Sequence, residues 1–182
     1  MTRRERVTAG FLYGIFICYI IFLIKLLFLS RVSLVDLFDS QRAAIRSINL
    51  IPFKSIKDYM VDDPATIRRF AFSNVVGNIV IFIPLGIFLL VFKNGKRIMA
   101  NVLLLFLVSL FVEIMQWLLG IGVADIDDII LNSLGGWIGI VGCKLLFVIL
   151  RDKRRVRTVI TMLSAIGLPA ILYILFMVKL RL

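Results

Sequence analysis

Residues 98–119 read IMANVLLLFLVSLFVEIMQWLL, an apolar run with very few polar interruptions. A helix needs about 20 mostly apolar residues to cross a bilayer. Four other stretches meet this requirement, so we predict five spans: Thr8–Leu29, Phe72–Phe92, Ile98–Leu119, Ile129–Leu150 and Thr158–Val178. The expected fold is an all-α, multi-pass transmembrane helical bundle with a long, partly interfacial loop between the first two spans.

The composition supports a small membrane protein. Of the 182 residues, 61% are hydrophobic, whereas soluble domains average about 45–50%. A chain of this size cannot bury that much apolar surface in water, which excludes a soluble globular domain. The net charge is +11, but no soluble domain carries a basic groove, so we expect the lipid bilayer and not a nucleic acid as the partner. The chain has no histidine, which excludes a Ser-His-Asp triad and a histidine-ligated zinc site.

The distribution of basic residues predicts the orientation. Lys and Arg favour the cytoplasmic side in short loops. They are frequent at the N-terminus and in the loops 93–97 and 151–157, and loop 120–128 contains none. We therefore expect a cytoplasmic N-terminus and, after five crossings of the cell membrane, an extracytoplasmic C-terminus.

The first loop, Ser30–Phe72, then lies outside the cell. It mixes basic and apolar side chains, which is typical of an interfacial, amphipathic segment. These side chains are Arg42, Arg46, Lys54 and Lys57 together with Ile45, Ile48, Ile56 and Tyr59. A surface loop that lies on anionic lipid explains the same pattern, and the two readings stay open here.

The polar residues of the spans gather near one membrane surface. Side chains three or four positions apart share one face of a helix, and the alternating topology brings the ends of three spans together. We predict a polar cluster at the outer surface that is a candidate binding site. Its members are Asn74, Asn78, Glu113, Gln116, Asp125, Asp127, Asp128 and Asn132.

Glu113 is the most informative member of this cluster. It lies about 9 Å inside the third span, at 1.5 Å per residue. Acidic side chains within a span are costly and are usually functional. Two interpretations stay open: Glu113 is a pocket carboxylate, or it pairs with Lys25 or a loop arginine and only holds helices together.

Three aspartates follow in the loop after the third span: Asp125, Asp127 and Asp128. Carboxylates this close repel one another unless a cation, a proton or a basic partner is present. A hard cation such as Mg²⁺ or Ca²⁺ suits oxygen ligands, and its ligands would be Glu113, Asp125 and Asp128. Alternatively, Asp127 or Asp128 caps the N-terminus of the fourth span. No cofactor is required by the sequence.

Glycines line one side of the fourth span. Gly135 and Gly139 have the small-xxx-small spacing that allows another helix to approach closely, and Gly136 and Gly142 lie nearby. We predict that these glycines pack helices together and hold the outer cluster in shape.

Two blocks of these residues carry a resemblance. The stretch Asn74-Val-Val-Gly-Asn78, which runs on through Pro84 to Gly86, resembles the second-span motif of the VanZ-like family. Glu113-Ile-Met-Gln116, followed by the three aspartates and Asn132-Ser-Leu-Gly135, resembles the second block of that family. Asn49–Phe53 resembles a third, weaker motif. The resemblance covers residues 10–150 of what we expect to be a single domain, 1–182. Gly122 stands where relatives often have a basic residue, and Ser133 where they often have Thr.

The resemblance implies an envelope protein, because the founding members of the family are associated with resistance to teicoplanin. The first hypothesis is therefore a protein that binds or modifies a lipid-linked or acyl-bearing molecule, such as a lipoglycopeptide, at the outer membrane surface. The alternative is a membrane-embedded, metal-dependent enzyme for a phospholipid or polyprenyl-phosphate substrate. A small transporter ranks last, because the inner halves of the spans carry few polar residues.

Overall fold

The computed structural model describes residues 3–29, 45–54, 57, 65–93 and 98–180. Arg42, Ile56 and Tyr59 of the predicted interfacial loop lie outside this set. The described chain is mostly helical, as predicted. The helices are α1 (Arg3–Ile24), the short π-helix η1 (Lys25–Leu29), α4 (Ala65–Lys93), α5 (Ile98–Leu118), α6 (Ile126–Leu150) and α7 (Lys153–Leu180).

Four of the predicted spans coincide with helices that are long and apolar enough to cross a membrane. Within the described residues, these candidate spans are Arg6–Leu29, Asn74–Phe92, Ile98–Leu118 and Ile126–Leu150. The fifth predicted span, Thr158–Val178, lies inside α7. The helix is confirmed there, whereas its crossing of the membrane stays a prediction.

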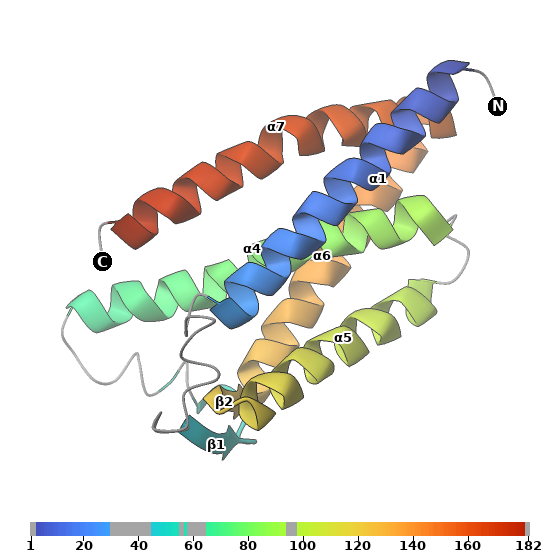
Figure 1. Cartoon of the computed structure of the whole chain (residues 1–182). Helices are drawn as coiled ribbons and strands as arrows, with labels where there is room; N and C mark the ends of the chain where they lie inside the picture. Colours follow the sequence, from blue (N-terminus) through green and yellow to red (C-terminus); the bar gives the residue numbers. More distant parts are fainter. Residues whose placement is uncertain (1–2, 30–44, 55–56, 58–64, 94–97, 181–182) are drawn as a thin grey trace. The chain divides into compact units, whose positions relative to one another are not determined.

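The helices are accompanied by two short strands that the sequence did not predict. β1 (Ile45–Asn49) pairs in parallel with β2 (Ile121–Asp125), and the register places Asn49 opposite Asp125. The sheet lies at the C-terminal end of α5 and the N-terminal end of α6 (Figure 1). A parallel pair requires a long connection between its strands, and here α4 and α5 lie within that connection.

The chain divides into two compact units. One contains Met1–Leu23 and Leu145–Leu182, and the other contains Ile24–Lys144. The second unit holds η1, the sheet, α4, α5 and most of α6. Its apolar core includes Phe82, Phe88, Leu105 and Ile140, all nearly inaccessible.

Within the second unit, α4 and α6 cross at glycines. A methyl group added to Gly135 or Gly139 would collide with the main-chain carbonyl oxygens of Ile79 or Ile83 on α4. A methyl group on Gly86 of α4 would collide with the carbonyl of Gly136. The two backbones are therefore in contact, which is the packing that the sequence predicted for Gly135 and Gly139.

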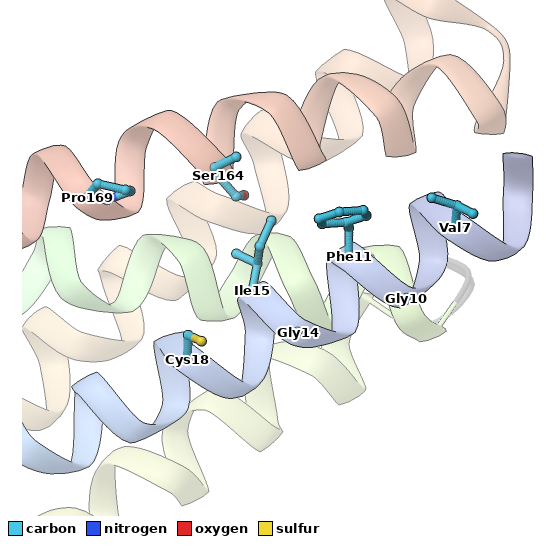
Figure 2. Close-up of a pocket in the computed structure, with 9 residues that line it drawn as sticks. Val7, Gly10, Phe11, Gly14, Ile15, Cys18, Ser164 and Pro169 are labelled. Carbon is cyan, nitrogen blue, oxygen red and sulfur yellow. The ribbon is translucent and has the colours of Figure 1, made fainter.

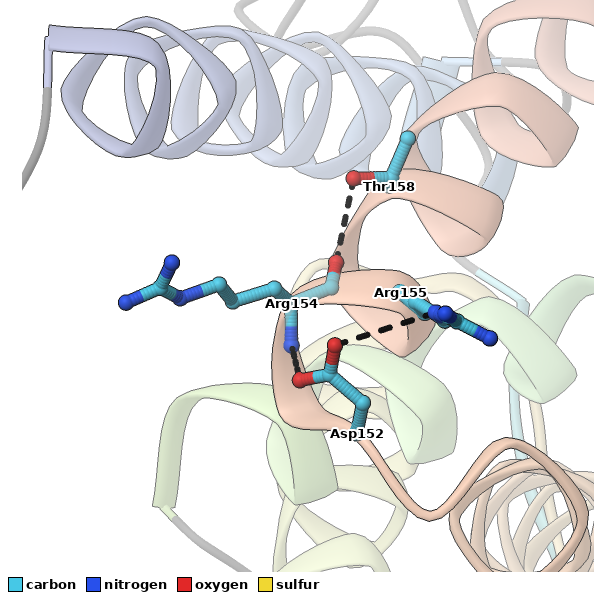
Figure 3. A network of polar contacts seen from close by, with 4 residues as sticks. All are labelled: Asp152, Arg154, Arg155 and Thr158. Atoms are coloured by element: carbon cyan, nitrogen blue, oxygen red, sulfur yellow. Dashed lines mark hydrogen bonds and ion pairs between the residues drawn. The ribbon is translucent and has the colours of Figure 1, made fainter.

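In the first unit, a tight turn joins the end of α6 to α7. Arg151 follows the last residue of α6 and adopts a φ of 52°. The Asp152 carboxylate accepts the backbone N–H of Arg154 at 2.9 Å and lies 3.9 Å from the Arg155 guanidinium (Figure 3). An aspartate that accepts an N–H of the first turn is a helix N-cap, so Asp152 fixes the start of α7.

Candidate functional site

The candidate site begins where the chain reverses direction after α5. Gly120 adopts a φ of 64° and donates its N–H to the Trp117 carbonyl at 3.0 Å. A positive φ at the end of a helix is adopted most readily by glycine. Because of this reversal, β2 runs back alongside α5 and brings the aspartates toward the middle of the helix.

The side chain of Glu113 accepts a hydrogen bond from the end of β2. Its side chain is only 3% exposed, and its Oε2 accepts the backbone N–H of Asp125 at 3.0 Å. A charge-assisted hydrogen bond of this kind is stronger than one between neutral groups. Glu113 and the aspartate-rich segment therefore meet, as the sequence predicted.

Asp125 links the sheet to α6. Its Oδ1 accepts the Nδ2–H of Asn49 at 3.2 Å and the backbone N–H of Asp127 at 2.9 Å. The second bond makes Asp125 the N-cap of α6. The prediction that Asp127 or Asp128 caps the fourth span was wrong, because the helix begins at Ile126, three residues earlier than expected.

Asp127 and Asp128 occupy the first turn of α6, and both are buried. The Asp127 carboxylate accepts the backbone N–H of Phe53. The Asp128 carboxylate accepts the Nδ2–H of Asn78 from α4 at 2.6 Å. Carboxylates are favoured at a helix N-terminus by the helix dipole. Three segments far apart in sequence are therefore joined at this one turn.

A deeper layer lies one turn further along α6. The Nδ2–H of Asn132 donates to Ser109 Oγ on α5 at 2.9 Å, and both residues are buried. On the other side of Glu113, nearer the C-terminal end of α5, Gln116 donates to the Leu27 carbonyl of η1 at 2.9 Å. Within the part of the chain that the structure describes, three buried oxygens have no hydrogen-bond partner: Gln116 Oε1, Asn132 Oδ1 and Ser133 Oγ. Buried polar atoms are normally paired, so the cluster retains capacity to accept hydrogen bonds.

Seven of the eight predicted residues therefore lie in or beside one buried polar cluster. Asn74 is the exception, because its side chain is exposed although it lies one turn from Asn78. The sequence missed Ser109 and Asn49. Ser109 precedes Glu113 by four residues, a spacing that places both on one face of α5. Asn49 belongs to the weak third motif, and no local pattern showed its pairing with Asp125.

The polar face of α5 is interrupted below this cluster. Asn101 is buried near the start of α5, but Leu105 lies between it and Ser109, is fully buried, and covers Gly136 of α6. The Leu105 side chain therefore interrupts the polar face of α5 between Asn101 and Ser109. A continuous polar path would have favoured a transporter, and these described residues do not form one.

The sequence comparisons agree with the motifs. The VanZ/LLP1 family profile matches residues 16–167, which include all eight predicted site residues. This protein belongs to the VanZ/LLP1 family. The chain is 30% identical over 128 residues to Protein VanZ of Enterococcus faecium, covering 70% of each chain. No solved structure matches the chain. Family membership and the apolar helices together identify a VanZ-like membrane protein.

The metal hypothesis gains no geometric support in this VanZ-family chain. Among the described residues, no group of three or more Cys, Asp or Glu side chains is placed to hold a metal ion. These carboxylates instead accept hydrogen bonds from N–H groups: Glu113 at Oε2, Asp125 at Oδ1 and Asp128 at Oδ1. The proposal of Mg²⁺ or Ca²⁺ at these residues stays a hypothesis.

The first unit of the VanZ-like chain contains a separate apolar cavity of about 640 Å³ between α1 and α7. Phe11 and Ile15 of α1 and Pro169 of α7 lie along it (Figure 2). Gly10 and Gly14 also line this cavity. None of the predicted site residues lines it, so the cavity and the polar cluster are different features of the molecule.

Proposed function

We propose that the protein binds or modifies a lipid-linked or acyl-bearing molecule at the extracytoplasmic surface of the bacterial cell membrane, and thereby confers resistance to teicoplanin. One observation carries this proposal. Glu113, Asp127 and Asp128 are buried together at one end of apolar helices. Buried carboxylates near the end of a membrane span are costly to place there and are usually functional.

The geometry of the cluster supports recognition of a polar head. The carboxylates of Glu113 and Asp128 are held by N–H groups from the backbone of Asp125 and the side chain of Asn78. Side chains fixed in this way lose little freedom when a ligand binds. The unpaired oxygens of Gln116 and Asn132 can accept further hydrogen bonds, so hydroxyl, amide or amine groups of a ligand suit this cluster.

The helix surfaces beside the cluster support contact with an acyl chain. Phe111 and Ile114 are exposed on α5, within one turn of Glu113. Apolar side chains that face the bilayer contact lipid tails. A molecule with a polar head and an acyl chain can therefore satisfy both surfaces at once.

The proposed orientation places the cluster outside the cell. Lys153, Arg154 and Arg155 are exposed in the first turn of α7, which follows the C-terminal end of α6, whereas Asp128 is at the N-terminal end of α6. Basic residues in a short loop favour the cytoplasmic side. The opposite end of α6 then faces the wall precursors and lipoglycopeptides that are outside the membrane.

Teicoplanin susceptibility tests this proposal. A susceptible bacterium would express the wild type or the variants Glu113→Gln, Asp128→Asn and Asn78→Ala, with membrane levels matched by immunoblot. We expect the wild type to protect and the three variants to lose protection. Asp152→Asn is the matched control for Asp128→Asn, because an asparagine also caps a helix and position 152 lies outside the cluster.

Two outcomes would overturn the proposal. If the three variants protect as well as the wild type at equal membrane levels, the cluster is only structural. If the wild type does not protect, this chain does not confer teicoplanin resistance in that host. Mass spectrometry of lipids that copurify with the protein would then identify what the cluster binds.

A further inference from the structure

The segment that follows β1 displays apolar side chains in an unusual way. Leu50 is 71% exposed, Ile51 is 60% exposed and Phe53 is 59% exposed. Pro52 between them is also exposed. We call Leu50–Phe53 the apolar tip. A contiguous group of exposed apolar side chains marks a surface that contacts a membrane or another protein.

Two contacts show the depth of the apolar tip relative to α5. Near the start of β1, the Arg46 guanidinium donates a hydrogen bond at 3.4 Å to the carbonyl of Leu118, which is the last residue of α5. At the end of β1, Asn49 bonds to Asp125, and Asp125 is itself held by Glu113. From Leu118 to Glu113 is about 7.5 Å along a helix. β1 therefore runs back beside the membrane span, and the tip follows its deeper end.

The apolar tip is held in a strained conformation. Phe53 adopts a φ of 62°, which is rare for a bulky residue. Its N–H donates to the Asp127 carboxylate, and Lys54 donates its N–H to the Ile51 carbonyl at 3.3 Å. Strained residues persist only where the surroundings hold them. The end of the tip is thus fixed to the first turn of α6, and Asn49, which precedes the tip, is fixed to Asp125.

Basic side chains flank the apolar tip. Arg46 precedes it, Lys54 follows it directly and Lys57 lies one turn later, and all three are exposed. Apolar residues between exposed cations are typical of a segment that enters the interface of an anionic membrane. The lipid bilayer is the partner that satisfies the depth, the apolar character and the charge together.

We propose that the apolar tip is a re-entrant anchor, which inserts Leu50, Ile51 and Phe53 into the leaflet next to the polar cluster while Lys54 and Lys57 contact anionic head groups. This anchor holds the start of α6, and with it Asp127, at the depth of the head groups. The inference does not depend on the proposed ligand, because it concerns only the bilayer that surrounds the protein.

Fluorescence quenching tests the insertion. The exposed Cys18 is replaced by alanine, and Cys143 is retained because it is buried. Ile51→Cys, Leu50→Cys and, as the control, Lys153→Cys are then labelled with an environment-sensitive nitrobenzoxadiazole probe in the full chain. The labelled proteins are reconstituted in vesicles of phosphatidylcholine, with and without phosphatidylglycerol. Quenchers are spin-labelled lipid in the membrane and iodide in water.

We expect the probes at positions 50 and 51 to emit at shorter wavelength than the probe at 153, and to be quenched by the spin-labelled lipid but not by iodide. Phosphatidylglycerol should strengthen the lipid quenching, and Lys54→Gln with Lys57→Gln should remove that increase. Position 50 provides a second reading if Ile51→Cys does not fold.

Three results would overturn the inference. Strong quenching by iodide at positions 50 and 51 would place the tip in water. Short-wavelength emission without quenching by lipid would mean that protein covers the tip. Equal quenching with and without phosphatidylglycerol would exclude the contact with anionic head groups.

Discussion

The two units of the chain use glycine in opposite ways. In the unit Ile24–Lys144, Gly135 and Gly139 of α6 lie directly against carbonyl oxygens of α4. In the other unit, Gly10 and Gly14 of α1 have a similar small-residue spacing, but no described atom lies within 4 Å of an added methyl group at either position. The same sequence pattern therefore accompanies a close helix crossing in one unit and open space beside a cavity in the other.

This difference follows from what each unit must hold in place. The Asn78 amide on α4 reaches the Asp128 carboxylate on α6, and this bond requires the two backbones to be close. In the first unit, the described residues that line the cavity are apolar or small, apart from Ser164. Small-xxx-small spacing permits a close crossing, but the facing helix decides whether one forms.

The largest expected effect on stability comes from adding a methyl group where α4 and α6 cross. Gly135→Ala would place a methyl group against the Ile79 carbonyl, and a main-chain atom cannot move aside as a side chain can. We expect a loss of about 3 kcal/mol in the free energy of unfolding. The loss of stability is measured as a lower melting temperature, by heating the protein in detergent and monitoring its unfolding by size-exclusion chromatography.

The control for this variant is Gly142→Ala, on the same helix but with nothing within 4 Å of the added methyl group. Equal melting temperatures for the two variants would show that α4 and α6 are not in backbone contact.

An intermediate effect is expected from removing the acceptor at the centre of the cluster. Glu113→Leu would leave the Asp125 N–H without its partner. A buried donor that loses its partner costs about 1–3 kcal/mol. Glu113→Gln keeps a carbonyl oxygen in reach and should cost less. The same unfolding assay compares the two variants, and equal losses would contradict a role for this hydrogen bond in stability.

The smallest effect is expected in the first unit. Gly14→Ala adds a methyl group in open space, and alanine is favoured over glycine in a helix by about 0.5–1 kcal/mol. We expect a slightly higher melting temperature than that of the wild type. A marked decrease would show that Gly14 packs as closely as Gly135, and the contrast between the units would be lost.

The sequence predicted the spans well because hydropathy over about 20 residues has a direct physical cause. It predicted the meeting of Glu113, Asp128 and Asn78 because helix periodicity and alternating topology bring them to one membrane surface. The start of α6 was misjudged, because Ile126-Asp127-Asp128 is polar enough to be taken for loop although it forms the first helical turn.

The sheet could not be predicted from local pattern. β1 and β2 have five residues each, and neither shows the alternation of a typical strand. The two strands pair residues that are 76 positions apart in the chain. The pattern of a single sequence does not show which distant segments will pair. The sequence predicts Asn74 in the cluster because it shares a face of α4 with Asn78. Sharing a face does not fix the depth, and only Asn78 is level with Asp128.

The parallel pairing of β1 with β2 also sets an order of assembly. During synthesis β1 leaves the ribosome first, and α4 and α5 follow before β2 appears. Contacts between distant segments form late, because they require the closure of a long loop. A nascent chain that ends after α5 already contains Glu113, Asn49 and Asn78, but not the aspartates that join them. The polar cluster can therefore be completed only after both intervening helices have been synthesised.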